Sequence, residues 1–141
     1  TVFMNQLDNP FCVFDNIYEI VRNSCDIILL DFHAEATSEK IAMGYYVDSK
    51  ISAIWGTHTH VQTADERILA GGCGYITDVG MCGALDGVIG VQKEAVIKKF
   101  KTQRPVRFEV EKEGKRQLNG IVLSFDDDLK LTYLHRVYKI F

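Results

Sequence analysis

Two histidines separated by one residue follow an apolar run near the middle of the chain. The run covers residues 51–55, and Gly56 leads from it to His58 and His60. Two imidazoles held this close together at the end of a strand are a common way to bind a metal ion. The spacing therefore indicates metal chemistry at the end of an expected strand.

A second apolar run ends in a histidine in the same way. Residues 27–32 are almost entirely apolar, which is typical of a strand covered on both faces, and His33 follows with Asp31 two residues before it. If both strands are parallel members of one open sheet, their carboxyl ends lie at the edge where such sheets bind ligands. We therefore expect His33, His58 and His60 to converge.

These residue types allow a specific chemistry. Three neutral imidazoles with an open coordination position describe a mononuclear zinc hydrolase, in which the zinc acidifies a bound water. Asp31 and Asp78, which ends a third expected strand, could each orient a histidine or bind the metal, or be ordinary strand-end aspartates. His135 lies inside an alternating strand without a partner motif, so we interpret it as a structural or surface residue.

The composition is that of one ordinary globular domain spanning residues 1–141. Hydrophobic residues make up 47% and charged residues 25% of the chain. The net charge of −3 provides no basic field, which disfavours polymeric nucleic acid but not a single nucleotide at a metal site. No apolar run approaches the roughly 20 residues that cross a bilayer, and the first residues lack a signal-peptide layout. We therefore expect a cytosolic protein with no membrane partner.

The cysteines and the first residue carry two further expectations. The four cysteines have neither Cys-x-x-Cys nor regular spacing, which predicts reduced thiols packed as small apolar residues. They are Cys12, Cys25, Cys73 and Cys82. The chain begins at Thr1 without an initiator Met, next to an expected strand at residues 2–5. We therefore expect a processed or partial polypeptide.

Helical patterns separate the expected strands. Asn9 before Pro10 predicts the start of one helix that runs to about residue 23, and Thr37 or Ser38 predicts the cap of another. The inner face of that second helix is expected to consist of Ile41, Ala42 and Tyr45. The alternation of strand and helix is the βαβ pattern of an α/β fold. Its strands are expected at residues 27–32, 51–55 and 75–78.

The second half of the chain has a different pattern. A glycine-rich loop at residues 79–91 fits neither the dinucleotide nor the P-loop spacing. A short amphipathic helix is expected at residues 93–101, with its apolar side chains buried. An antiparallel meander follows, with a solvated turn at residues 126–128. Its strands are expected at residues 106–110, 118–125 and 129–140.

Three blocks of sequence carry a family resemblance when they are taken together. They are residues 31–40, which contain Asp31-Phe32-His33, residues 56–65, which contain Gly56-Thr57-His58-Thr59-His60, and residues 75–81. In this order they resemble the YmdB-like branch of the calcineurin-like metallophosphoesterases. The resemblance covers essentially the whole chain. It implies an α/β sandwich of two mixed β-sheets flanked by helices, of which this chain would be the C-terminal half, ending in the antiparallel meander.

The resemblance also implies an activity and its cofactors. Members of the family are bacterial phosphodiesterases, with 2′,3′-cyclic nucleotides among the substrates attributed to them. They hold two metal ions, commonly iron or manganese, with zinc as the alternative, and a metal-bridging hydroxide attacks phosphorus in line. The implied partners are a small phosphodiester or cyclic nucleotide and, for the full-length form, further copies in a homo-oligomer.

The matching motifs imply a role for each histidine. His58 would share one ion with His33, and His60 would bind the other ion. Asp31 and Thr59 are the candidates for orienting these ligands, whereas Asp78 is not a ligand in this pattern. The family's acidic ligands and proton-donating histidine belong to motifs that do not occur in this chain, so we expect no catalytic residue here. Because neutral imidazoles offset none of the charge of two cations, we expect the other half to be needed.

Two other interpretations remain open. A non-catalytic, truncated or split half would bind a partner or a single metal weakly, and the absent acidic ligands favour this reading. A mononuclear zinc hydrolase would instead hold one zinc ion tightly in this chain alone.

Overall fold

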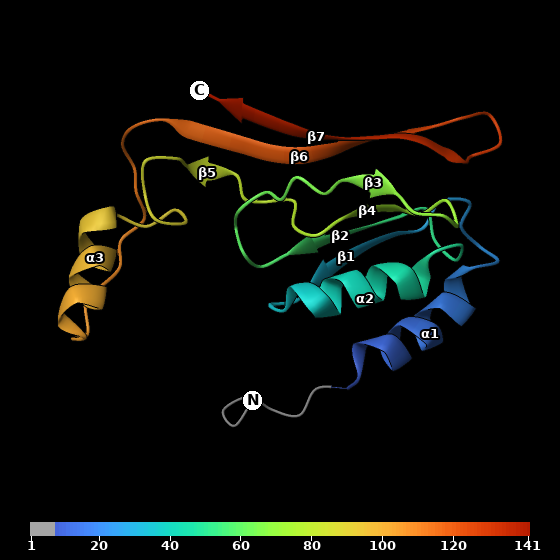
Figure 1. Cartoon of the computed structure of the whole chain (residues 1–141), viewed down its shortest axis with the longest axis horizontal. Helices are drawn as coiled ribbons and strands as arrows, with labels where there is room; N and C mark the ends of the chain where they lie inside the picture. Colours follow the sequence, from blue (N-terminus) through green and yellow to red (C-terminus); the bar gives the residue numbers. More distant parts are fainter. Residues whose placement is uncertain (1–7) are drawn as a thin grey trace.

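The computed structural model describes residues 8–141, which form two β-sheets and three helices (Figure 1). The strand expected at residues 2–5 lies outside the described residues. The helices are α1 (Pro10–Val21), α2 (Thr37–Val47) and α3 (Lys93–Thr102). The strands are β1 (Leu29–His33), β2 (Ala53–Thr57), β3 (Arg67–Ile68), β4 (Gly74–Ile76), β5 (Gly83–Ala84), β6 (Arg116–Phe125) and β7 (Leu131–Ile140).

The first sheet contains the strands that end in the candidate residues. Its order is β1-β2-β4-β3, with β1, β2 and β4 parallel and β3 antiparallel to β4. The connection from β1 through α2 to β2 is the predicted βαβ unit, so this prediction is confirmed. Because parallel strands end at the same edge, the segments that follow β1, β2 and β4 all emerge on one side of the sheet.

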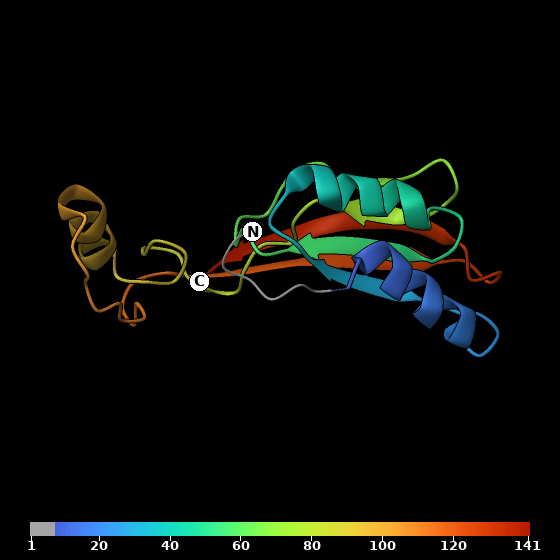
Figure 2. The ribbon, with the colours of Figure 1, turned by 90° about the horizontal axis from the view of Figure 1, so that it is seen from below.

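The elements are stacked in three layers (Figures 1 and 2). Helices α1 and α2 cover one face of the first sheet, and the sheet β5-β6-β7 lies over the other face. The core between the helices and the first sheet includes Phe14, Met43, Ile54 and Tyr75. On the other face, the chain comes so close that a Cβ built on Gly74 would lie 2.6 Å from Leu131 of β7. The expected fold of two sheets flanked by helices, with an antiparallel meander at the C-terminus, is confirmed.

Three predictions about helix ends and faces have different outcomes. Asn9 caps α1 as predicted, because its side chain accepts a hydrogen bond from Phe11 N at 3.0 Å. The predicted cap of α2 is wrong, since Thr37 is already helical and Ala36 precedes it. The predicted inner face of α2 is also wrong in part, because Tyr45 is 62% exposed. The buried residues of this helix are Lys40, Met43, Gly44 and Val47.

A close approach between α2 and the sheet explains why α2 buries a different face from the predicted one. A Cβ on Gly44 would lie 2.5 Å from the ring of Tyr75, so only glycine lets the helix pack this tightly.

The expectation that the strand at residues 27–32 is covered on both faces is also wrong. Phe32 is buried against the helices, whereas Leu29 is 47% exposed, because β1 is an edge strand that the second sheet does not cover.

Helix α3 projects away from the stacked layers, as Figure 2 shows. Only Val96 of this helix is buried, and Phe100 is 77% exposed, so the expected burial of its apolar residues is wrong. The strand predicted at residues 106–110 does not form, apart from one bridge between Val91 and Val110. The short strand β5 takes its place as the first member of the meander.

The cysteines are free thiols, as predicted. Cys73 is buried, and burial raises the pKa of its thiol to about 12. The expected packing is wrong for Cys12, Cys25 and Cys82, which are exposed. Among residues 8–141, no helix has the length and apolar character that crossing a membrane requires.

A candidate metal-binding site at the carboxyl ends of β1 and β2

Strand pairing brings the first two candidate histidines together. His33 is the last residue of β1, and it lies opposite Thr57, the last residue of the parallel neighbour β2. His58 comes directly after Thr57. The parallel register therefore places His33 beside His58, although 25 positions separate them in the sequence.

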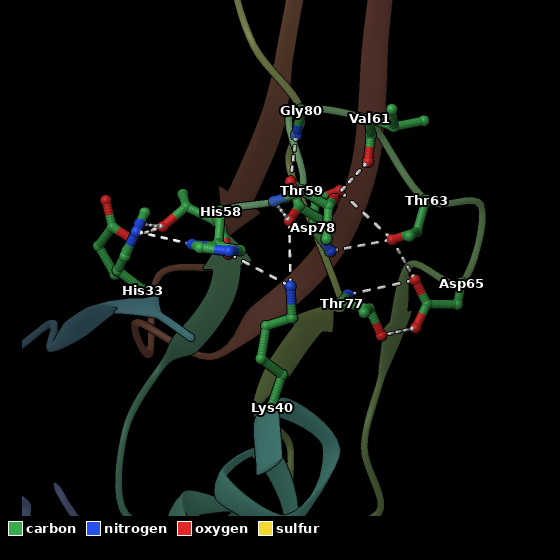
Figure 3. Close-up of polar contacts among 12 residues, drawn as sticks. His33, Lys40, His58, Thr59, Val61, Thr63, Asp65, Thr77, Asp78 and Gly80 are labelled. Atoms are coloured by element: carbon green, nitrogen blue, oxygen red, sulfur yellow. Dashed lines mark hydrogen bonds and ion pairs between the residues drawn. The ribbon is translucent and has the colours of Figure 1, made fainter. Parts of the chain in front are cut away.

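The imidazole rings of His33 and His58 meet edge to face at this edge of the sheet (Figure 3). Nε2 of His33 lies 3.1 Å from Nδ1 of His58, and the ring centroids are 5.0 Å apart at an interplanar angle of 72°. Both side chains are exposed. Two ring nitrogens that meet at one accessible point form an arrangement in which imidazoles ligate a metal ion.

His60 lies apart from this pair. Within residues 8–141, no hydrogen bond joins His60 to either of the other two histidines. It lines an open cavity of about 810 Å³ between the loop after β2 and the second sheet, together with Gln62, Asn119 and Arg136. The structure thus brings together two of the three predicted metal ligands, and the role of His60 stays a prediction.

The donor set fits the histidine side of a metal centre. Neutral imidazoles supply nitrogen ligands suited to iron, manganese or zinc but offset none of the charge of a cation. In the part of the chain that is described, no three His, Cys, Asp or Glu side chains are grouped so that they could hold a metal ion.

Asp31 reaches the histidine pair through Thr57. The hydroxyl of Thr57 donates to Oδ1 of Asp31 at 3.1 Å, and Nδ1 of His33 lies 3.0 Å from the same hydroxyl oxygen. Asp31 and His33 are two residues apart on one strand, so their side chains lie on one face of the sheet. The predicted role of Asp31 as an orienting residue is thus supported by an indirect contact that the sequence did not reveal.

A buried ion pair holds the backbone around His58 (Figure 3). Lys40 rises from α2, and its Nζ lies 3.0 Å from Oδ2 of Asp78 and 3.2 Å from the carbonyl oxygen of Thr57. The same carboxylate oxygen accepts a hydrogen bond from Thr59 N at 2.9 Å. The side chains of Lys40 and Asp78 are 1% and 0% exposed. The pair therefore fixes the peptide groups on both sides of His58.

The backbone at this loop adopts a conformation that needs such support. His58 and His60 have φ angles of 107° and 65°, in a region that residues with a side chain rarely occupy. Gly56 is required for a different reason, since a Cβ there would lie 1.9 Å from the carbonyl oxygen of Thr77 and 2.5 Å from Cδ of Lys40. The glycine of the Gly-x-His-x-His motif thus makes room for the ion pair.

The environment of Asp78 explains why it is not placed as a ligand. Burial opposes its ionisation, but hydrogen bonds from Thr59, Gly80 and Lys40 outweigh burial and hold the pKa of Asp78 below its usual range. Its oxygens are occupied by these donors. Thr59 contacts Asp78 and the carbonyl oxygen of Val61 rather than a histidine. Thr59 therefore orients the backbone of the loop rather than the side chain of a candidate ligand.

Sequence reasoning missed Lys40, although a signal was present. Lys40, Met43, Gly44 and Val47 recur at the i, i+3, i+4, i+7 spacing of one helix face. A lysine in line with buried positions indicates a buried cation, and a buried cation needs a partner. Asp78 at the end of an adjacent strand would have been the natural candidate.

A second carboxylate fixes the loop that follows the histidines. Asp65 accepts hydrogen bonds from the hydroxyls of Thr63 at 2.6 Å and Thr77 at 2.5 Å. Burial opposes its ionisation, but these hydrogen bonds hold the pKa of Asp65 below its usual range. Asp65 therefore connects the loop after β2 to Thr77 at the end of β4.

Comparison with known proteins gives a consistent result. A family profile described as "YmdB-like protein" matches residues 1–137. The 2′,3′-cyclic-nucleotide 2′-phosphodiesterase of Bacillus subtilis (strain 168) is 53% identical over 128 residues, which cover 91% of this chain and 48% of the relative.

Two solved structures also resemble this chain. A hypothetical protein from Thermus thermophilus superposes with a TM-score of 0.89 and 37% identity, covering 99% of this chain and 54% of that one. A structure described as a novel phosphatase from Mycoplasma pneumoniae superposes with a TM-score of 0.86 and 40% sequence identity. This match covers 94% of this chain and 47% of that one. The chain thus spans about half the length of the proteins that it matches.

Replacing Lys40 tests the importance of the buried ion pair. We expect Lys40→Met to lower the free energy of unfolding by about 3–5 kcal/mol, because it leaves the Asp78 carboxylate buried without its cation. Lys130→Met is the matched control, since it removes an ion pair whose side chains are 76% and 80% exposed and should cost no more than about 1 kcal/mol. Urea unfolding of the three proteins measures both effects. Equal stability of the two variants would contradict the role given to the pair.

The lowered pKa of Asp65 predicts a pH dependence. A carboxyl group whose pKa is lower in the folded state stabilises the fold above its unfolded pKa, about 3.9, and loses that contribution as the pH falls through the folded pKa. We expect the stability of Asp65→Asn to fall less steeply below about pH 4 than that of the wild type. Asp127→Asn, in the exposed turn between β6 and β7, serves as the control and should keep the wild-type slope. Thermal unfolding at a series of pH values measures the slopes.

Proposed function

Because this chain belongs to the YmdB-like protein family, we propose that it contributes the histidine side of a metal-dependent phosphodiesterase centre. The observation that carries this proposal is the pair of imidazole nitrogens of His33 and His58, 3.1 Å apart at the carboxyl edge of a parallel sheet. The activity in the name of the Bacillus relative, which acts on 2′,3′-cyclic nucleotides, supports a phosphodiester as the substrate.

His33 and His58 would hold one metal ion, and His60 would hold a second. Iron or manganese is the proposed metal, with zinc as the alternative, because imidazole suits all three. The bound ions would supply Lewis-acid stabilisation of the phosphoryl oxygens and an activated water. The residues of this chain would hold and place the ions, while Lys40 and Asp78 keep the loop that bears His58 in position.

The proposed substrate is a small phosphodiester such as a 2′,3′-cyclic nucleotide. The cavity beside His60 has a volume of about 810 Å³ and is lined by Arg136 and Lys139 but by no acidic side chain. Such a lining favours a ligand that carries a phosphate group. The net charge of −3 supports a small ligand rather than polymeric nucleic acid.

The acidic ligands of the proposed centre would come from the part of the relatives that this chain does not span. The absence of a third ligand beside His33 and His58 within residues 8–141 also favours a second candidate, a half that binds one metal ion and is not catalytic by itself. A mononuclear zinc hydrolase would need His60 to join the pair. We further propose a cytoplasmic location and a homo-oligomer, for which the exposed Phe100 and Ile97 of the projecting helix offer contact area.

Removing one histidine of the pair tests the proposed function. In the chain complemented with the missing part of a relative, we expect His58→Ala to lose both bound metal and hydrolysis of 2′,3′-cyclic AMP. The control is Thr132→Ala, since Thr132 is exposed on β7 and belongs neither to the histidine pair nor to the lining of the cavity beside His60. Elemental analysis and product formation are measured on the same samples.

Each outcome of this experiment has a distinct meaning. Full metal content and normal turnover of His58→Ala would contradict the assignment. Turnover only after complementation would support a split centre, whereas one tightly bound zinc and turnover of the chain alone would support the mononuclear alternative.

A further inference from the structure

We propose that Thr57 is a positioning residue that fixes the tautomer of His33. Its hydroxyl connects the carboxylate of Asp31 to Nδ1 of His33, and this connection leaves Nε2 of His33 unprotonated, with its lone pair facing His58. The inference rests on the proposed function only where it concerns metal binding. The tautomer of His33 can be tested in the metal-free chain and does not depend on the proposed function.

The direction of each hydrogen bond follows from the number of protons available. A threonine hydroxyl has one proton, and an ionised carboxylate can only accept. Thr57 therefore donates to Oδ1 of Asp31, over 3.1 Å, and has only lone pairs left for His33. Since Nδ1 of His33 lies 3.0 Å from that hydroxyl oxygen, Nδ1 must carry the proton of the neutral ring.

The other nitrogen of His33 is then an acceptor. Nε2 lies 3.1 Å from Nδ1 of His58, so the proton between the two rings lies on Nδ1 of His58 and would leave to solvent if an ion took its place. A histidine ligates a metal through an unprotonated ring nitrogen, and the hydrogen bond made by the other nitrogen decides which one that is. The Asp31–Thr57 connection therefore prepares Nε2 of His33 as the ligand atom.

The fold holds Thr57 firmly enough for this role. Thr57 lies opposite His33 in the parallel register, and its carbonyl oxygen accepts a hydrogen bond from the buried Nζ of Lys40. Its branched side chain has few rotamers, which limits the directions that the hydroxyl can take. Thr59, which occupies the other intervening position of the motif, directs its hydroxyl to the carbonyl oxygen of Val61 instead. The two threonines thus have different tasks.

The tautomer can be measured without any metal. In the ¹⁵N-labelled, metal-free chain near pH 8, long-range ¹H–¹⁵N spectra should show His33 with its proton on Nδ1. Thr57→Val has nearly the same shape but no hydroxyl, and it should give a mixture of the two tautomers. Thr57→Ser keeps the hydroxyl and should restore the wild-type spectrum. Thr132→Val removes a hydroxyl from β7 far from the site and should leave His33 unchanged.

A zinc titration of the same four proteins provides the second readout. We expect Thr57→Val to bind Zn²⁺ about 10–100-fold more weakly, because the loss of a contact that orients a ligand has this effect. Thr57→Ser and Thr132→Val should bind like the wild type. A merely structural role of Thr57 would lower the stability of Thr57→Val without changing the tautomer of His33.

The outcomes separate this inference from the proposed function. An unchanged Nδ1–H tautomer in folded Thr57→Val would overturn the inference, even if zinc binds. Loss of the tautomer in Thr57→Val and its recovery in Thr57→Ser would support it. If those spectra are found and none of the proteins binds zinc, the positioning of His33 stands and the proposed metal centre fails.

Discussion

The ion pair between Lys40 and Asp78 is the constraint on which the candidate site depends. Two opposite charges with almost no exposed surface are tolerable because they also bind backbone groups. Lys40 donates to the carbonyl oxygen of Thr57, and Asp78 accepts from the amides of Thr59 and Gly80. A helix on one face of the sheet thereby fixes the loop at the end of β2. The same hydrogen bonds that stabilise the charges hold His58 at a φ of 107°, a conformation that would otherwise relax.

The parallel register supplies the other half of the geometry. Pairing of β1 with β2 sets His33 opposite Thr57, so the histidine, the hydroxyl and the carboxylate of Asp31 lie on one face within hydrogen-bonding distance. A slip of one residue would turn these side chains to the helix-covered face. In the proposed metal site, neutral imidazoles would place the ions but would not balance their charge. The proposed site therefore fits a chain that spans about half the length of its relatives.

The meeting of His33 and His58 was predictable, since apolar runs that end in histidines identify strands whose carboxyl ends share an edge. The ion pair between Lys40 and Asp78 was harder to predict from the sequence, because a single lysine in a helix is normally exposed. The strand predicted at residues 106–110 and the burial of Phe100 both failed, because alternation and amphipathicity show only that a segment has an apolar face. Neither reveals whether another element lies there to cover that face, as the projecting α3 demonstrates.

The metal site proposed at the edge formed by His33 and His58 can be observed directly. The most direct test is a crystal structure of the manganese-soaked protein with anomalous data collected at the manganese edge. We expect an anomalous peak between the two rings, bonded to Nε2 of His33 and to a ring nitrogen of His58. A peak bonded to other side chains, with none between the rings of His33 and His58, would contradict this assignment.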